Sequence, residues 1–384
     1  MIIILRFSYL KKALFGAIFF LLYGLHGFCC AHANERYWLQ IMPKNELWIR
    51  YLDTKPDSKD QCPTITADGK PYKMNVYKAK DDKFPTSCKL AFKVNKLPKS
   101  AVLDDKKINI NLKLQDIKKI AVIGDTGCRV HKFINQDCKN DWYFKQIADA
   151  VLLHKPDIIL HVGDYIYREH GYQDKWQVWK EDFFDPADSI LKSGIPWIMV
   201  RGNHEDCKRN GNGWFALLSD KPENCHNHSQ IYSVKINDID LLVTDSTLEE
   251  DLLADLKKIN SDLVQKKTWI TTHRPVVGVG KNGELIGYKK ILSDLDDKVK
   301  MIISGHVHAL QVIKHNQIVQ LIAGNSGTLL SYEVAKNISK QDANSVMEYG
   351  FTMIEFLGDR VSLSSYNKDG AKILQDQYLD CPCK

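Results

Sequence analysis

The stretch KIAVIGDTG, residues 119–127, decides the fold. After its leading lysine the run is apolar, and Gly124 and Asp125 follow it directly. A short, almost continuously apolar run is typical of a strand that is buried on both faces, as in a parallel sheet covered by helices. The stretch DIILHVGDYIY, residues 157–167, repeats this pattern. Together they predict an α/β domain with polar residues at the ends of buried strands.

Buried strands alternate with amphipathic helices from Lys118 onward. The predicted strands cover residues 119–124, 157–163, 195–201, 240–245, 268–272 and 300–304. The predicted helices cover residues 141–154, 174–192 and 249–265. Such alternation predicts a layered α/β domain. Residues 311–375 return to strand patterns, which we assign to the same domain as further sheet.

The charge balance of the chain argues against a nucleic-acid partner. Lys and Arg number 53 and Asp and Glu number 47 in 384 residues, and three of the cations, Arg6, Lys11 and Lys12, lie in a leader without acidic residues. The remaining excess is small and contains no basic block of the kind that nucleic-acid surfaces need. With 44% hydrophobic and 26% charged residues, the composition is that of a globular protein.

The first 33 residues have the form of a signal peptide. Lys11 and Lys12 precede the uncharged run 13–25, and Ala31 and Ala33 stand at positions −3 and −1 of a cleavage site. An uncleaved anchor is the alternative, but it would usually need about 20 apolar residues. We therefore expect a periplasmic or secreted protein, cleaved near Ala33, with no membrane span after processing.

Residues 36–113 differ in their hydrophobic pattern from the rest of the mature chain. Short alternating runs such as 46–52 are separated by Pro, Gly, Asp and Lys, which favours a β-rich module. The predicted parts are a signal peptide (1–33), a small β-rich N-terminal domain (34–115) and an α/β domain (116–384).

Export changes the interpretation of the cysteines, because disulfides persist in oxidising compartments. Eight of the ten cysteines lie after residue 33. Short loops close at the lowest entropic cost, which favours three local pairs among many possible connectivities. These pairs are Cys62 with Cys88, Cys128 with Cys138, and Cys207 with Cys225. Cys381 and Cys383 are too close in sequence for an easy bridge, so their pairing stays open.

Five of the predicted strands end in side chains that can bind metal ions. The residues at these ends are Asp125, Asp164 with Tyr167, Asn203 with His204, His273, and His306 with His308. Ligands in open α/β sheets bind beyond the carboxyl ends of the strands, so these side chains can converge on one crevice. Carboxylate, amide, imidazole and phenol groups suit two metal ions. Two adjacent cations can ionise a water for in-line attack at phosphorus.

At these residues the sequence resembles the calcineurin-like metallophosphoesterase superfamily. The superfamily pattern is GDx(G/H), GDxx, GNH(E/D), a histidine after a strand, and GHxH, and all five elements occur in this order between Gly124 and His308. Tyr167, third after Asp164, is similar to the GDxxY element of purple acid phosphatases. The resemblance covers about half of the mature chain. It implies a four-layer αββα sandwich, here preceded by the β-rich domain.

The resemblance also implies a role for each matched residue. Asp125, Tyr167 and His308 would bind one metal, and Asn203, His273 and His306 the other. Asp164 would bridge the two metals, and His204 would be the catalytic histidine. A phenolate ligand implies iron(III) paired with zinc, manganese or iron(II), with divalent zinc or manganese in both positions as the alternative.

The resulting expectation is an exported dinuclear-metal phosphoesterase of acid phosphatase type. It would hydrolyse small phosphate monoesters by attack of a metal-bound hydroxide. The alternatives are a phosphodiesterase on the same centre and an inactive secreted binding protein. The candidates for substrate binding are His170, Arg274 and Asn325. The sequence makes no prediction about the oligomeric state.

Overall fold

The structure is a computed structural model that describes residues 35–55, 60–332, 334 and 336–380. The predicted signal peptide and its cleavage site lie outside the described residues, as do Cys381 and Cys383. None of the helices in the described part of the chain combines the length and the apolarity that crossing a membrane requires.

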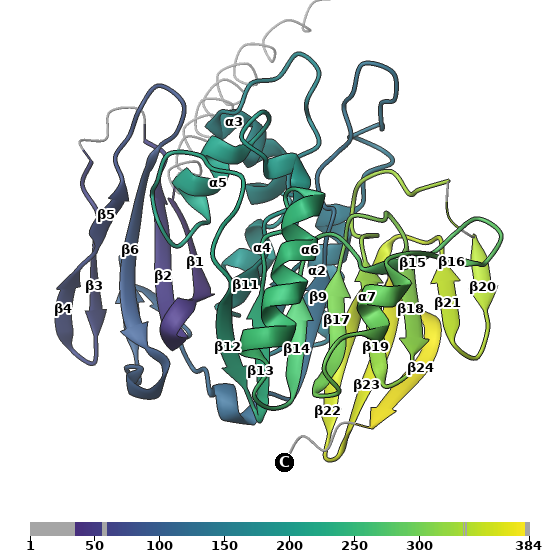
Figure 1. The fold of residues 1–384 in the computed structure, drawn as a ribbon. Helices are drawn as coiled ribbons and strands as arrows, with labels where there is room; N and C mark the ends of the chain where they lie inside the picture. The colour runs from purple at the N-terminus through teal and green to yellow at the C-terminus, as the bar shows by residue number, and fades with distance from the viewer. Residues whose placement is uncertain (1–34, 56–59, 333, 335, 381–384) are drawn as a thin grey trace, which may run out of the picture.

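A ten-stranded sheet forms one inner layer (Figure 1). Its strands, in spatial order, are β24 (Lys372–Asp380), β23 (Arg360–Asn367), β22 (Gly350–Leu357), β9 (Lys119–Ile123), β10 (Ile158–His161), β11 (Trp197–Met199), β1 (Glu35–Met42), β2 (Glu46–Asp53), β6 (Thr86–Lys93) and β5 (Asn75–Lys78). The four central strands, from β9 to β1, are parallel, and the flanking pairs are antiparallel.

An eight-stranded sheet forms the second inner layer. Its strands are β12 (Tyr232–Ile236), β13 (Ile239–Val243), β14 (Thr268–Thr271), β17 (Val299–Ser304), β19 (Ile318–Ala323), β18 (Leu310–His315), β21 (Ala343–Val346) and β20 (Asn337–Ser339). Two small sheets complete the β structure. One pairs β15 (Val277–Val279) with β16 (Leu285–Gly287), and the other contains β4 (Lys70–Lys73), β3 (Thr64–Ala67), β7 (Ala101–Leu103) and β8 (Lys106–Ile108).

Helices cover the outer faces of both sheets. The α-helices are α2 (Phe144–Leu153), α3 (Trp176–Trp179), α4 (Asp188–Leu191), α5 (Gly211–Leu217), α6 (Glu249–Lys258) and α7 (Lys289–Ser293). Figure 1 shows α6 and α7 lying over the eight-stranded sheet. The π-helical turns η4 (Lys180–Phe184) and η6 (Ile259–Leu263) continue α3 and α6, and η1 (Pro43–Asn45), η2 (Val94–Lys96), η3 (Leu114–Asp116) and η5 (Asn203–Glu205) are short 3-10 turns.

Three hydrophobic cores separate these four layers. Alternate residues of β9 face opposite ways: Val122 lies in the core between the two sheets, whereas Ile123 packs with the helices on the outer face. In β17, Ile303 likewise faces the other sheet, and Ile302 packs with α6 and α7. Because both faces of these strands are covered, both sets of residues are apolar. The predicted αββα sandwich is confirmed.

The predicted β-rich segment does contain strands, and four of them extend the ten-stranded sheet. β1 pairs in parallel with β11 at Gln40 and Trp197, and β2, β6 and β5 follow it outward. Leu39 and Ile49 lie in the core between the sheets. The segment therefore shares a sheet and a core with the sandwich, and the domain boundary after residue 115 stays a prediction.

The predicted elements differ from the observed ones mainly in the helix predicted over 174–192. It is divided into α3, η4 and α4, and Pro186 lies between the last two. Proline cannot donate a backbone hydrogen bond, so the helix stops there. All three local disulfides are present and join Cys62 to Cys88, Cys128 to Cys138, and Cys207 to Cys225.

Candidate metal centre

The predicted ligands meet beyond the carboxyl ends of β9, β10, β11, β14 and β17. Asp125 follows β9, Asp164 and Tyr167 follow β10, and Asn203 lies in η5 after β11. His273 follows β14, and His306 and His308 follow β17. All seven side chains are buried or half-buried. The structure thus brings together residues that are separated by up to 183 positions in the sequence.

One group of donor atoms surrounds the phenol of Tyr167. Its hydroxyl lies 2.7 Å from Oδ1 of Asp125, 2.8 Å from Oδ2 of Asp164 and 2.9 Å from Nε2 of His308. This group contains the three residues assigned to the first metal, together with the residue assigned to the bridge.

A second group of donor atoms lies on the other side of Asp164. Nε2 of His273 is 3.0 Å from Oδ1 of Asn203 and 3.1 Å from Oδ2 of Asp164. Donor atoms of Asp164, His273 and His306 all lie within 4.8 Å of one another. The same oxygen, Oδ2 of Asp164, therefore contacts both groups.

The backbone at three of the ligands is in the left-handed region. The φ angles are 56° at Asp125, 58° at Asp164 and 68° at His306. Residues other than glycine rarely adopt such angles, and they persist where the surrounding structure enforces them. Of the glycines that directly precede these residues and Asn203, only Gly163, at 99°, has a positive φ.

Most of these glycines are instead required because there is no space for a side chain. A Cβ atom at Gly202 would lie 2.1 Å from Oδ1 of Asp164, and one at Gly305 would lie 2.5 Å from Oδ2 of Asp125. The carboxylates of the centre thus occupy the space that side chains would fill.

Backbone carbonyls orient two of the histidines. Nδ1 of His273 lies 2.8 Å from the carbonyl oxygen of Val162, and Nδ1 of His308 lies 2.8 Å from that of Leu329. Because a carbonyl only accepts, Nδ1 carries a proton in both rings, so Nε2 is the nitrogen that would bind a metal after losing any proton of its own. A hydrogen-bonded Nδ1 is the usual arrangement in a metal-binding histidine.

The electrostatics of the centre favour a cation. Burial raises the pKa of Asp125 to about 8, and burial together with the two carboxylates raises the pKa of the Tyr167 phenol well above its ordinary value. Burial also acts to raise the pKa of Asp164, but the charges of His273 and His204 outweigh it and hold that pKa well below its ordinary value. Metal ligands bind in their deprotonated forms, so a bound cation would offset the free-energy cost of ionising these buried groups. The donor set and its charge fit metal binding.

Glu205 supports the loops from beneath, a role that the sequence did not reveal. Its carboxylate is fully buried and accepts backbone N–H groups from Asp164 at 3.1 Å, Tyr165 at 2.9 Å and Gly202 at 3.0 Å. Burial raises its pKa to about 8. Its position directly after the GNH run was the available signal.

His204 lies beside the donor groups rather than within them. Its Nε2 is 3.9 Å from Oδ2 of Asp164, and its ring centre is 4.1 Å from that of Tyr167. Its Nδ1 is 2.5 Å from Oε1 of Glu169, which also lies 3.3 Å from Nη1 of Arg209. Sequence reasoning missed Glu169 and Arg209, because their proximity depends on packing.

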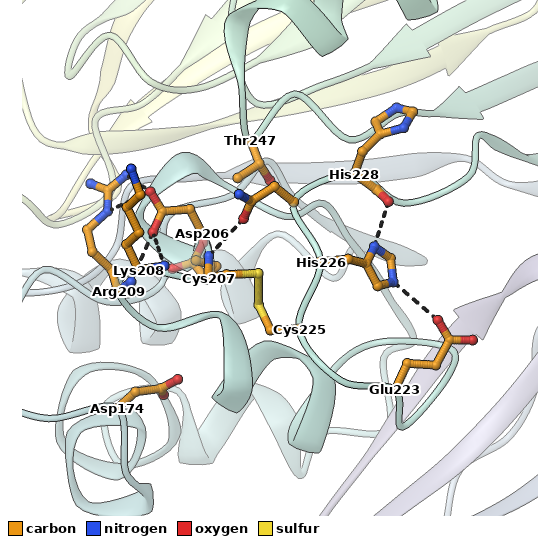
Figure 2. The surroundings of a disulfide bond; sticks show 12 residues. Asp174, Asp206, Cys207, Lys208, Arg209, Glu223, Cys225, His226, His228 and Thr247 are labelled. Atoms are coloured by element: carbon orange, nitrogen blue, oxygen red, sulfur yellow. Dashed lines mark hydrogen bonds and ion pairs between the residues drawn. A yellow bond between two sulfur atoms is a disulfide. The ribbon is translucent and has the colours of Figure 1, made fainter.

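A disulfide holds the segment that follows His204. Figure 2 shows Cys207 joined to Cys225 beside Asp206 and Arg209, whose side chains form an ion pair at 2.9 Å. On the other side of the bridge, Nδ1 of His226 lies 2.7 Å from the carbonyl oxygen of His228, and Nε2 lies 3.2 Å from Oε2 of Glu223 (Figure 2). These contacts hold His226 within its own loop.

The three candidates for substrate binding have different surroundings. Nη1 of Arg274 lies 3.0 Å from Nε2 of His306, and its Nε donates to the carbonyl oxygen of Ser246 at 3.1 Å. The Asn325 side chain is buried and donates to the backbone of Glu348. His170 is exposed. Of the three, only Arg274 has a side-chain hydrogen bond to one of the predicted ligands among the described residues.

Comparisons with solved structures reveal similar folds at low sequence identity. The purple acid phosphatase PPD1 from seeds of yellow lupin (Lupinus luteus) is 13% identical, with a TM-score of 0.61 over 91% of this chain and 74% of that chain. GAP50, the anchor in the inner membrane complex of Plasmodium, is 14% identical, with a TM-score of 0.48 over 69% of this chain and 89% of that chain. At such identities the likeness concerns the fold alone. A search of curated proteins finds no match.

A family model provides the decisive comparison. The model described as calcineurin-like phosphoesterase matches residues 118–310, which is half of the chain. The matched region contains both donor groups and His204. Members of this family are metal-dependent phosphoesterases, in agreement with the donor atoms gathered at the strand ends. The chain therefore belongs to the calcineurin-like phosphoesterase family.

Proposed function

We propose that the protein is an exported phosphatase of purple acid phosphatase type that hydrolyses phosphate monoesters at a centre of two metal ions. The observation that carries this proposal is the position of Asp164. Its Oδ2 lies 2.8 Å from the Tyr167 hydroxyl and 3.1 Å from Nε2 of His273, so one oxygen belongs to both donor groups. A carboxylate in this position is suited to hold two cations close together.

The two donor groups divide the ligands between the metals. Asp125, Tyr167 and His308 would hold the first metal, and Asn203, His273 and His306 the second, with Asp164 shared. When bound, the pair of cations supplies a water activated for in-line attack and neutralises charge on the phosphate.

His204 is placed to protonate the leaving group. The Glu169 carboxylate lies 2.5 Å from Nδ1 of His204, and Nε2 of the same ring is directed toward the donor groups, 3.9 Å from Oδ2 of Asp164. The proton on Nε2 would pass to the bridging ester oxygen as the P–O bond breaks. The ring is not needed as a metal ligand, since it lies outside both groups.

Arg274 supports a monoester as the substrate. Its guanidinium contacts His306 and is partly buried beside the second donor group. A monoester dianion places more negative charge on its terminal oxygens than a diester does, and the fork of an arginine matches phosphate geometry. Arg274 would therefore bind the monoester more strongly.

Export is supported by the three disulfides. Disulfides persist in oxidising compartments and are rare in the cytosol. Each of the three closes a short segment, with sequence separations of 26, 10 and 18 residues.

The proposed activity can be tested with purified protein loaded with iron, zinc or manganese. We expect release of nitrophenol from p-nitrophenyl phosphate, with a kcat/KM well above that for bis-p-nitrophenyl phosphate. The reverse order would favour a phosphodiesterase. Absence of turnover with both esters under every metal loading would favour a binding protein on this scaffold.

The Tyr167→Phe variant tests the identity of the first metal. A phenol that is buried beside two carboxylates resists ionisation, so a strongly acidic cation such as iron(III) is needed to hold it as phenolate. We expect purified wild-type protein to absorb visible light and the variant to lose that band. The matched control is Tyr165→Phe, which removes a buried hydroxyl that donates to the carbonyl oxygen of Val200 at 3.0 Å. An unchanged visible spectrum in Tyr167→Phe would show that Tyr167 is not a metal ligand.

A further inference from the structure

A cavity lies beside Glu169, the residue whose carboxylate contacts Nδ1 of His204. Its volume is about 450 Å³, and its lining includes Glu169, Arg209, Lys83, Lys175 and Lys208. Cavities of this size hold small organic ligands.

Two of the residues that line the cavity contact residues of the candidate metal centre. Glu169 lines it and contacts Nδ1 of His204 at 2.5 Å. Arg209 also lines it, and its guanidinium donates to the backbone carbonyl of Asn203, one of the predicted ligands. The cavity therefore adjoins the segment that carries Asn203 and His204.

The lining of the cavity carries an excess of positive charge. Five of its residues are basic, and two, Glu169 and Asp174, are acidic. The two arginines are paired, Arg168 with Asp182 at 2.5 Å and Arg209 with Asp206 at 2.9 Å. The remaining basic residues are the three lysines.

The three lysines are available to an anion from outside the chain. Lys83, Lys175 and Lys208 are exposed, and none of them forms an ion pair with any residue that the structure describes. Asp174 forms no ion pair with these lysines among the described residues, and its carboxylate accepts the backbone N–H of Gly213. Several unpaired cations around one cavity attract a ligand with more than one negative charge.

Each lysine comes from a different segment, and two contacts hold these segments in place. Lys83 lies in the loop between β5 and β6, and its carbonyl oxygen accepts the N–H of Trp176, which follows Lys175 and begins α3. Lys208 directly follows Cys207 of the disulfide, as Figure 2 shows. The loop between β5 and β6 therefore contributes one wall of the cavity.

We infer that the preferred substrates are phosphate monoesters whose leaving group carries a further phosphate, which the three lysines bind. This inference rests on the proposed phosphatase function. The scissile bond joins phosphorus to the ester oxygen, a water oxygen replaces that ester oxygen on phosphorus, and the ester oxygen leaves with the proton from His204. The second phosphate remains on the departing alcohol, in the cavity.

A matched pair of sugar phosphates tests the inference. Glucose 1,6-bisphosphate differs from glucose 6-phosphate by one phosphate, and release of inorganic phosphate measures both. We expect the wild-type kcat/KM to be at least about tenfold higher for the bisphosphate, with a preference that decreases as ionic strength rises. In the variant Lys83→Gln/Lys175→Gln/Lys208→Gln, the ratio of the two values should fall toward one.

A control variant carries the same change in net charge at the other end of the molecule. Lys44, Lys113 and Lys235 are exposed and line a groove of about 890 Å³ beside the amino end of β9, opposite the metal centre. Their replacement by glutamine should leave the ratio unchanged. If the ratio of the two kcat/KM values falls equally in both triple variants, the effect is a general one of charge and the inference is overturned.

Failure of the inference can be told apart from failure of the proposed function. If the wild type hydrolyses p-nitrophenyl phosphate but shows no preference for the bisphosphate, only the inference is wrong. If no metal loading yields any turnover, the proposed function is wrong, and the inference that depends on it is wrong as well.

Discussion

Replacement of Asp164 by alanine is expected to remove both metals and to reduce turnover to the background rate. Its Oδ2 contacts the Tyr167 and the His273 groups, so its loss takes one ligand from each. Its Oδ1 also accepts the backbone N–H of His204 at 2.8 Å, so the proposed catalytic histidine loses its anchor too. Metal analysis of the purified variant, together with p-nitrophenyl phosphate hydrolysis, measures both effects.

A second variant separates loss of the bridging charge from a failure of the protein to fold. Asp164→Asn preserves the shape of the side chain and can still accept the hydrogen bond of His204, but it lacks the negative charge that a bridge between cations needs. It should show the same metal loss with a thermal unfolding midpoint near that of the wild type. Asp294→Ala, an exposed change directly after α7, should alter neither metal content nor turnover. Full occupancy of both metals in Asp164→Asn would disprove the bridging role.

Replacement of His204 by alanine should keep both metals and lower kcat by about 10² to 10⁴, the usual range for a general acid. The metals stay because His204 lies outside both donor groups. Turnover falls because the departing oxygen would lose its proposed proton donor. Metal analysis and steady-state kinetics on the same preparation measure the two effects.

The nature of the leaving group distinguishes proton donation from a purely structural role. Nitrophenolate leaves readily without a proton, whereas an alkoxide does not. The defect of His204→Ala should therefore be larger with an alkyl phosphate than with p-nitrophenyl phosphate. Glu169→Gln, which keeps a polar side chain beside Nδ1 but removes the negative charge, should show the same trend with a smaller loss. Equal defects with both substrates, or loss of metal, would contradict the assigned role.

Local sequence was sufficient for the strands that carry the ligands. The runs ending at Gly124 and Gly163 are apolar on both faces, because each strand is covered by helices on one side and by the second sheet on the other. When both faces of a strand are buried, nearly every residue of the strand is apolar. Such a strand can therefore be recognised from its own sequence, without knowing which strands lie beside it. The same locality explains why the three short-range disulfides were predicted correctly.

The partners of the N-terminal strands could not be predicted in this way. The alternation in residues 46–52 indicates a strand, but it carries no information on which strand lies beside it. Only the parallel pairing of Gln40 with Trp197 reveals that this segment extends the main sheet. Such a pairing depends on long-range packing, and any apolar strand edge of suitable length would have matched the pattern equally well.

The sequence by itself determined the kind of chemistry, since the donor atoms and the order of the motifs are properties of the residues. Tertiary structure alone decided what surrounds them: Glu205 beneath the loops, Glu169 at His204, and three lysines around one cavity that form no ion pair within the described part of the chain. A carboxylate or a lysine looks the same in sequence whether it is solvated or placed against a reactive group. Its role depends on which distant segments fold against it, and that is settled only when the layers pack.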